Sequence, residues 1–367
     1  MRQMTFLDLC SGIGGFRLGL ERAGHKCIGY CEYDKFARAS YEAMYDTEGE
    51  WKADDVTKLK SEDVPDADIW CFGFPCQDIS VAGKQRGLVG KRSGIYYNII
   101  DLIKGKEESD KPAYLLVENV KNLLSVNAGF DFASVLSEMD QAGYDCRWQV
   151  LNSKNFGVPQ NRERVFIIAN LRSRGRREIL PLCGENAAAL VKLIDGMQGY
   201  RVYSTEGISA TLVGNAGGIG AKTGLYFIGQ SNTAPKVTDT NSAVLEVHPV
   251  LTPERMEKRQ NGRRMKEDGE PMFTLTSQDR HGVYICEKAD DREGSEKTGT
   301  LLKGGRIRRL TPRECFRLQG FPDELYEKAA AVNSDAQLYK QAGNAVTATV
   351  AYAVAMSLPE SREPDIF

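Results

Sequence analysis

Cys76 stands in a short loop sequence that could make its thiol a nucleophile. The segment Gly73-Phe74-Pro75-Cys76-Gln77 follows the apolar run Ile69–Gly73, which predicts a buried strand. Proline stiffens the chain before the cysteine and glycine permits a turn, whereas Cys71, inside the strand, is typical of a small core residue. Alone, the Pro-Cys dipeptide could also be a rigid turn with an incidental thiol. Because a thiolate becomes reactive when cations or hydrogen bonds lower its pKa, we expect covalent catalysis here.

A carboxylate and two guanidiniums are expected near Cys76, at the edge of the sheet where the predicted strands end. The apolar strand Tyr114–Glu118 ends in an acid, which needs a partner or a chemical role because an unpaired buried carboxylate is unstable. The sequence QNRER leads into the strand Val165–Ala169, and its two arginines could anchor a base carbonyl or a carboxylate. The simpler alternatives are a helix cap for the acid and surface charge for the arginines. The cations that could lower the thiol pKa are Lys84, Arg86, Arg162 and Arg164.

A glycine turn near the N-terminus could hold a ligand. The sequence FLDLCSGIGG, residues 6–15, predicts a strand, a turn and the start of a helix. Glycines there let the backbone approach a ligand at the helix N-terminus. Such a turn is also a common tight connection, so it is weak evidence alone. The spacing is not GxGxxG, which argues against a nicotinamide cofactor and favours an adenosyl ligand without a pyrophosphate.

Two acids strengthen the case for that ligand. Glu32 ends the second expected strand, where a carboxylate binds the ribose diol in sheets of this kind. Asp55 lies before the next strand-like run and is a further candidate. Each acid alone could instead be a solvated loop carboxylate or a helix cap.

Alternating strands and helices are predicted to position these residues. Strands are expected at Thr5–Cys10, Cys27–Cys31, Ile69–Gly73, Tyr114–Glu118, Trp148–Leu151 and Val165–Ala169, and helices at Gly14–Ala23, Lys35–Met44, Gly94–Lys104 and Phe130–Ala142. This alternation indicates an α/β fold with a mostly parallel sheet covered on both faces. The carboxyl ends of the strands would then bring the glycine turn, Cys76 and Glu118 to one edge.

The pattern changes in the middle of the chain, which is rich in Gly and Arg and irregular. We expect a small β-rich domain there, with short strands at Ser209–Leu212, Leu225–Ile228, Met272–Leu275, Val283–Cys286 and Thr298–Leu301. Helical periodicity returns from Leu310, and Ala342–Met356 predicts one helix that packs back on the first half. The predicted domains are therefore 1–170 with 310–367, and an insertion at 171–309.

Composition narrows the class of protein. A chain of 367 residues is long enough for one large domain and a smaller one. Nine cysteines without a CxxC pair and three scattered histidines argue against a zinc site and favour a reduced, cytoplasmic protein. No apolar signal core and no bilayer-length apolar run is present, so we expect neither export nor membrane insertion. The net charge of −2 does not decide whether nucleic acid binds.

Six ordered motifs resemble the signature blocks of the bacterial and phage DNA cytosine-5 methyltransferases of restriction-modification systems. They are DLCSGIGG, GFPCQ, Glu118-Asn119-Val120, QNRER, LTPREC from Leu310, and QAGNAV from Gln341. Any one motif would be weak evidence, whereas six in this order are specific and span nearly the whole chain outside its irregular middle. The resemblance implies a Rossmann-like S-adenosylmethionine-dependent methyltransferase fold, in which 171–309 is the target-recognition domain.

The resemblance also implies the roles of the catalytic residues. Cys76 would add to C6 of cytosine, Glu118 would hold the proton at N3, and Arg164 would hold the base O2 with support from Arg162. C5 would then take the methyl group of S-adenosylmethionine, and loss of the C5 proton would free the enzyme. Cofactor contacts are implied for Asp8, Cys10, Gly12, Ile13, Gly14, Glu32, Tyr33, Asp55, Val56, Pro75, Asn344 and Val346. Cys10 is a departure, since many members have an aromatic residue against the adenine there.

Double-stranded DNA is the implied substrate and partner, and the cytosine must leave the duplex to reach Cys76. The loop Ser80–Tyr96 combines glycine hinges with positive charge and could close over DNA, although a solvated loop is the alternative. DNA contacts are expected from Ser80, Lys84, Gln85 and Arg86, and base reading from Arg280 and His281. A cognate restriction endonuclease would act separately, and we expect a monomer.

Two other functions stay open on the sequence. The tRNA-directed branch of the same family shares the chemistry, but its members generally lack so long an insertion between QNRER and LTPRE. A non-catalytic DNA-binding protein could keep the fold for binding only, but this chain has every catalytic residue.

Overall fold

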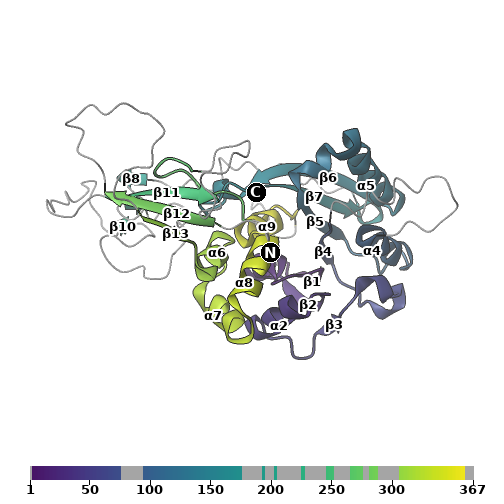
Figure 1. Cartoon of the computed structure of the whole chain (residues 1–367). Coiled ribbons are helices and arrows are strands. Elements are labelled where there is room, and N and C mark those ends of the chain that lie inside the picture. Colours follow the sequence, from purple (N-terminus) through teal and green to yellow (C-terminus); the bar gives the residue numbers. More distant parts are fainter. Residues whose placement is uncertain are drawn as a thin grey trace.

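The computed structural model places the chain around one large twisted sheet (Figure 1). It describes residues 2–75, 94–175, 192–194, 202–204, 225–227, 245–251, 265–275, 281–287 and 306–359. The large sheet has the strand order β3-β2-β1-β4-β5-β7-β6. Its strands are β1 (Thr5–Leu9), β2 (Lys26–Cys31), β3 (Trp51–Ala53), β4 (Ile69–Gly73), β5 (Tyr114–Val120), β6 (Tyr144–Asn152) and β7 (Glu163–Leu171).

The predicted mostly parallel sheet is confirmed. Neighbouring strands are parallel from β3 to β5, whereas β7 lies antiparallel between β5 and β6. The short strand β3 was not predicted, because three residues carry too short a pattern.

Helices cover both faces of the sheet, because its central strands carry apolar side chains on both sides. Leu115 and Val117 of β5 lie in one apolar cluster with α4 (Ile95–Lys104) and α5 (Phe130–Gln141). Tyr114 and Leu116 lie in another with α1 (Gly15–Arg22) and α9 (Ala348–Met356). The predicted return of the C-terminal helix to the first half of the chain is therefore confirmed.

A third apolar cluster joins α2 (Lys35–Met44) to α6 (Pro312–Leu318), α7 (Asp323–Val332) and α8 (Asp335–Asn344). Figure 1 shows α6 and α8 between the large sheet and a smaller antiparallel sheet, β11-β12-β13. Short 3-10 turns complete the connections: η1 (Val56–Lys58), η2 (Ser61–Asp63), η3 (Lys121–Leu124), η4 (Val126–Gly129), η5 (Ser153–Asn155) and η6 (Arg172–Arg174).

The prediction of one helix over Ala342–Met356 is wrong. The chain forms α8, an extended break from Ala345, and then α9. The break turns two main-chain carbonyls toward Arg162, which donates to the oxygens of Gly343 (3.2 Å) and Ala345 (2.9 Å). A contact with a residue far away in the sequence thus overrides a local helical pattern.

In its described residues, the middle of the chain forms two three-stranded sheets. They contain β8 (Lys192–Ile194), β9 (Val202–Ser204) and β10 (Leu225–Phe227), and β11 (Leu245–Leu251), β12 (His281–Glu287) and β13 (Arg306–Arg309). Two predicted strands coincide with β10 and β12, whereas Ser209–Leu212 and Thr298–Leu301 lie outside the described residues. The domain boundaries at 170 and 310 stay predictions.

The strand predicted at Met272–Leu275 is wrong, because this segment binds the QNRER motif instead. The main-chain N–H of Met272 donates to the carbonyl of Pro159, and the N–H of Asn161 donates to the carbonyl of Met272, both at 2.9 Å. The N–H of Leu275 donates to the side-chain oxygen of Gln160 (2.9 Å). These bonds leave the segment with an isolated bridge to Gln160 in place of a ladder.

In the part of the chain that the structure describes, no helix has the length and apolar character needed to cross a membrane.

Candidate active site

Glu118 and Arg164 form an ion pair at the end of the large sheet where its parallel strands have their carboxyl ends. Glu118 is on β5 and Arg164 is near the start of the antiparallel β7, so the two strands bring the side chains together. The Arg164 Nε lies 3.1 Å from the Glu118 Oε1, and both side chains are less than one fifth exposed. A buried acid at a strand end was expected to need a partner, and Arg164 is that partner.

β4 ends directly beside this ion pair. Gly73 is the register partner of Glu118, and a Cβ at Gly73 would lie 3.7 Å from the Glu118 Oε2. The side chain of Asn119 donates to the carbonyl of Phe74 at 2.7 Å and is itself buried. The chain therefore passes next to Glu118 as it leaves β4. The next residue after Phe74 is Pro75, which is exposed. Cys76 follows, outside the described residues, as do Ser80, Lys84, Gln85 and Arg86.

Arg162 is placed differently from Arg164. Its side chain is buried and donates to the carbonyl oxygens of Leu275 (2.8 Å), Gly343 and Ala345. Burial lowers the pKa of Arg162 to about 9, with a smaller contribution from the positive charge of Arg164. The group is still a cation at neutral pH. Arg162 therefore holds the QNRER motif, the segment near Leu275 and the α8–α9 break together.

The glycine turn after β1 has backbone conformations that favour glycine. Gly12 has φ +56° and Gly14, which precedes α1, has φ +78°. Cys10 also lies in the left-handed region, at φ 54°. Because no described residue has an atom within 4 Å of a Cβ built on Gly12, the turn is open on that side. The side chain of Ile13 is fully buried, so we expect only its main chain to reach a ligand.

Glu32 holds this turn from the end of β2. Its carboxylate accepts from the main-chain N–H groups of Gly12 and Asp34, both at 2.7 Å. Burial raises the pKa of Glu32, although the two N–H donors act in the opposite direction. Tyr33 is next to it with a side chain 77% exposed. The Glu32 carboxylate therefore contacts the turn directly, and the next residue along the chain presents an uncovered aromatic ring.

Asp55 and Val56 follow β3 at the same end of the sheet. The Asp55 carboxylate accepts from the hydroxyl (2.7 Å) and the N–H (3.0 Å) of Thr57, and the hydroxyl contact lowers the pKa of Asp55. Lys58 pairs with its other oxygen at 3.2 Å. The side chain of Val56 is buried. Asp55 thus caps η1, as the simpler alternative expected, and the cap also fixes its carboxylate at this edge.

The segment Asn344–Val346 lies directly against the glycine turn. A Cβ at Gly15 would lie 2.1 Å from the carbonyl oxygen of Val346, so only glycine fits. Asn344 is exposed and Val346 is partly buried. The first and last motifs, more than 300 residues apart in the sequence, therefore form one surface.

Asp8 lies beneath the turn. It is 1% exposed, its carboxylate accepts from the main-chain N–H of Arg17, and the Tyr41 hydroxyl donates to it at 3.5 Å. Burial raises the pKa of Asp8 well above its usual range. Gly14 precedes α1 without a side-chain cap, so Asp8 supplies the acceptor for the first turn of that helix. We therefore expect Asp8 to support the turn and not to touch the ligand.

Four cysteines away from the loop are inert core thiols, as predicted for Cys71 from its position inside a strand. Cys27, Cys31, Cys71 and Cys315 are buried. Burial raises the pKa of Cys31 and Cys315 to about 12, so both stay protonated at neutral pH.

His281 begins β12 and is 6% exposed, which leaves little of its side chain for a base edge. Arg280 lies outside the described residues, so base reading by these two residues stays a prediction. Sequence reasoning missed the roles of Asn119 and Gln160. Both belong to recognised motifs, but nothing local indicates their contacts with Phe74 and Leu275.

Comparisons with known proteins identify the family of this chain. A family model described as C-5 cytosine-specific DNA methylase matches residues 4–360. The chain is 31% identical to the orphan methyltransferase M.SPRI of Bacillus phage SPR, over 95% of this chain and 96% of that protein. It is 29% identical to the type II methyltransferase M.HhaI of Haemophilus parahaemolyticus, over 98% of this chain and 95% of that protein.

The solved structure of the Entamoeba histolytica methyltransferase EhMeth is also similar, with a TM-score of 0.56 over 97% of this chain and 98% of that one. At 14% identity this likeness shows the fold alone. The family model and the relatives confirm the resemblance of the six motifs. The chain belongs to the C-5 cytosine-specific DNA methylase family and is a DNA cytosine-5 methyltransferase.

Proposed function

We propose that the chain transfers a methyl group from S-adenosylmethionine to C5 of a flipped-out cytosine in a specific double-stranded DNA sequence, through a covalent adduct between Cys76 and C6. The ion pair between Glu118 and Arg164, beside the end of β4, is the observation that carries this proposal. One edge of cytosine presents N3 and O2 side by side. A carboxylate next to a guanidinium can hold a proton at N3 and donate to O2 together.

The chain's own residues supply the covalent chemistry. The Cys76 thiolate forms a bond to C6, and the ring electrons move toward N3 and C5. Glu118 holds the proton at N3 and Arg164 donates to O2, which stabilises the charge that develops on the ring. S-adenosylmethionine, when bound, supplies the methyl group that C5 takes up. A base then removes the C5 proton, the bond from sulfur to C6 breaks, and the thiolate returns.

The residues around the glycine turn fit S-adenosylmethionine. Gly12 leaves open space, Glu32 offers carboxylate oxygens to ribose hydroxyls, and the exposed ring of Tyr33 can cover an adenine. Val346 lies against Gly15 of the same turn, and Asn344, Asp55 and Pro75 are proposed as further contacts. Cys10 would meet the adenine with a small thiol.

Base flipping follows from the direction of attack. A thiolate must approach C6 from above the ring, where the neighbouring base pair stacks in a duplex. Extruding the cytosine requires only a few kcal/mol, which contacts with the displaced base and the phosphates can supply. We propose that Ser80, Lys84, Gln85 and Arg86 contact the DNA and that residues 171–309 read the sequence.

M.SPRI is named an orphan methyltransferase. We propose that this chain acts as a monomer and that any cognate endonuclease acts separately.

Methyl transfer to defined nucleic acids tests the proposal. Labelled S-adenosylmethionine would be incubated with duplex DNA or tRNA and with the parent, a Cys76→Ser variant or a Cys146→Ser variant. The parent should label DNA only. Cys146→Ser is the control and should do the same, because Cys146 is on β6 with its sulfur 3.5 Å from that of Met139. Cys76→Ser should lose the activity. A Cys76→Ser variant that methylates as fast as the parent would overturn the covalent mechanism, and labelled tRNA would overturn the substrate.

Trapping the adduct gives an independent measurement. In a duplex with 5-fluorocytosine at the target, fluorine cannot leave C5 as a proton does, so the bond to sulfur should persist. A denaturation-resistant complex is expected from the parent and Cys146→Ser, and none from Cys76→Ser. Bisulfite sequencing of DNA from a methylation-free host that expresses the chain would then identify the site.

A further inference from the structure

Tyr45, which directly follows α2, contacts the glycine turn through its hydroxyl. The hydroxyl donates to the carbonyl oxygens of Gly14 (2.9 Å) and Ile13 (3.3 Å). The ring packs so closely on the turn that a Cβ at Gly14 would lie 2.6 Å from it. The absence of a side chain at Gly14 therefore serves this contact as well as the left-handed backbone.

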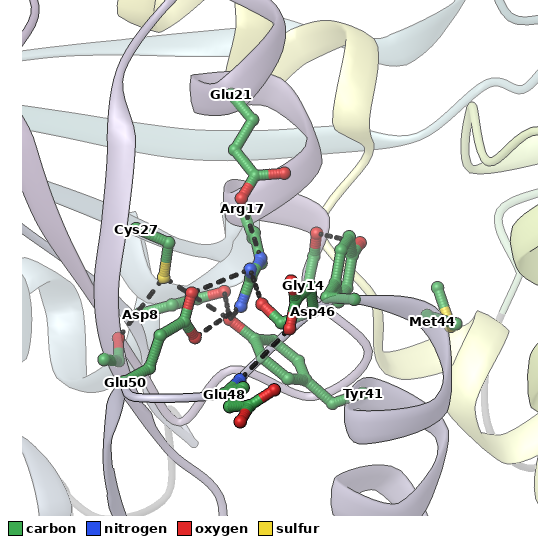
Figure 2. A network of polar contacts seen from close by, with 12 residues as sticks. Asp8, Gly14, Arg17, Glu21, Cys27, Tyr41, Met44, Asp46, Glu48 and Glu50 are labelled. Atoms are coloured by element: carbon green, nitrogen blue, oxygen red, sulfur yellow. Dashed lines mark hydrogen bonds and ion pairs between the residues drawn. The ribbon is translucent and has the colours of Figure 1, made fainter.

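Arg17 holds the Tyr45 ring in place. Its guanidinium lies 4.6 Å from the centre of that ring and donates to both carboxylate oxygens of Glu50, at 2.8 and 2.9 Å. It also donates to the main-chain carbonyl of Asp46 at 2.9 Å. Figure 2 shows Arg17 at the centre of this network, between Glu21 and Glu50 and close to Gly14. The segment after α2 is thus fixed to the first turn of α1.

The glycine turn is therefore held by side-chain hydrogen bonds on two sides. The Glu32 carboxylate accepts from the N–H of Gly12, and the Tyr45 hydroxyl donates to the next carbonyls. In a planar trans peptide the N–H points opposite to the C=O, so fixing a carbonyl also fixes the N–H of that peptide group. Burial raises the pKa of Tyr45 well above its usual range, so the hydroxyl remains a donor at any working pH.

We propose that Tyr45 is a positioning residue for the methyl donor, whose hydroxyl preforms the glycine turn for S-adenosylmethionine. The inference rests on the proposed binding of S-adenosylmethionine at this turn. The peptide groups of Ile13 and Gly14 each also have one main-chain bond. The N–H of Gly14 donates to the carbonyl of Ser11, and the N–H of Leu18 donates to the carbonyl of Gly14, both at 2.9 Å. Without the Tyr45 hydroxyl each group would lose its second restraint, and the binding-competent fraction would fall. Cofactor affinity should fall with it, whereas the reaction of bound cofactor should not change.

A Tyr45→Phe variant tests the inference, because it removes the hydroxyl and keeps the ring. Tyr30→Phe is the matched control: the Tyr30 hydroxyl donates to Glu42 on α2 at 2.6 Å, and the Tyr30 ring stacks on Tyr41. The measurements are the Kd of S-adenosylhomocysteine, the KM of S-adenosylmethionine and kcat on duplex DNA. Tyr45→Phe should raise Kd and KM roughly threefold to tenfold with kcat unchanged, as expected for one lost hydrogen bond. Tyr30→Phe should leave all three unchanged.

The outcomes separate this inference from the proposed function. Parent protein that binds neither S-adenosylmethionine nor S-adenosylhomocysteine would overturn the proposed cofactor. Parent that binds both, with a Tyr45→Phe variant of equal Kd and KM, would overturn the role of Tyr45 alone, as would a fall in kcat at constant KM. Hydrogen exchange of the peptide spanning residues 10–18 adds a direct readout. It should be faster in cofactor-free Tyr45→Phe than in the parent or Tyr30→Phe, and equal rates would contradict preformation.

Discussion

Arg17 and Arg162 are both almost fully buried near the edge of the large sheet, yet their charges meet different partners. Arg17 is 3% exposed and forms ion pairs with Glu50 and Glu21. Arg162 is 2% exposed and donates to three main-chain carbonyls. Among the described residues, no carboxylate lies within ion-pair distance of Arg162. Carboxylates neutralise Arg17 directly, whereas Arg162 is held by carbonyl dipoles and Glu118 acts on it only from beyond ion-pair distance.

The two pKa values follow this difference. Burial alone would lower the pKa of Arg17, but its neighbours, Tyr41 and Glu50 among them, raise it above its usual range. Nothing offsets burial as strongly at Arg162. Carboxylates neutralise a cation but occur only where the sequence has an acid, whereas carbonyls occur at every residue. Arg162 can therefore join three distant segments, provided that a helix breaks to free the carbonyls, as α8 does.

Arg162→Met should give the largest loss of stability. The change leaves three carbonyls without their charged donor, and we expect the free energy of unfolding to fall by about 4 kcal/mol, as for other broken buried networks. Urea unfolding at pH 7.5 and pH 5.5 measures it. The loss should be equal at both pH values, because no carboxylate is left unpaired. A loss that depends on pH would mean that Arg162 is neutralised by an acid after all.

Arg17→Met should give a loss that depends on pH. Removing the cation leaves Glu21 and the largely buried Glu50 without their ion-pair partner, which destabilises the fold by roughly 3 kcal/mol at neutral pH. Burial raises the pKa of Glu21 and Arg17 lowers it, so without the cation the folded pKa of Glu21 would rise further and the folded state would bind more protons as pH falls. The deficit should therefore be largest at pH 7.5 and smaller at pH 5.5. Equal deficits would remove the contrast with Arg162.

The sequence predicted the strands and the site residues that have a local sequence pattern. Five-residue apolar runs such as Ile69–Gly73 were found at the correct positions, because strands buried on both faces must be apolar throughout. The proximity of Glu118 and Arg164 was predicted because both lie near strand ends that meet at one edge of the sheet. The break after α8 and the contact of Tyr45 with the glycine turn did not, because each depends on residues brought together only by the fold. Cys76, though found from its motif, lies outside the described residues.

Arg164→Met tests whether an arginine paired with a largely buried acid acts more in chemistry than in folding. Its side chain is 16% exposed and pairs with Glu118. Stability should fall by roughly 2 kcal/mol, about half of the loss from Arg162→Met, because the largely buried Glu118 carboxylate loses its partner. Methyl transfer should fall by roughly a hundredfold, since a positioned donor to the reacting base is lost. Unfolding and kcat are measured on the same preparation, and a stability loss as large as that of Arg162→Met would assign Arg164 to the fold.

Asp323→Asn gives the smallest effect and extends the comparison to a second neutralised arginine. The buried Arg317 donates to Asp323 at 2.7 Å, and this contact lowers the pKa of Asp323. A carboxyl group whose folded pKa is depressed stabilises the fold above its unfolded pKa and loses that contribution as pH falls through the folded value. Asp323→Asn should therefore be about 1 kcal/mol less stable than the parent at pH 7. The two should converge once pH falls below the depressed folded pKa of Asp323, where the parent carboxyl is also protonated. Unfolding curves that stay equally separated down to acid pH would show that Arg317 does not depend on the charge of Asp323, and neutralisation by carboxylates would then be particular to Arg17.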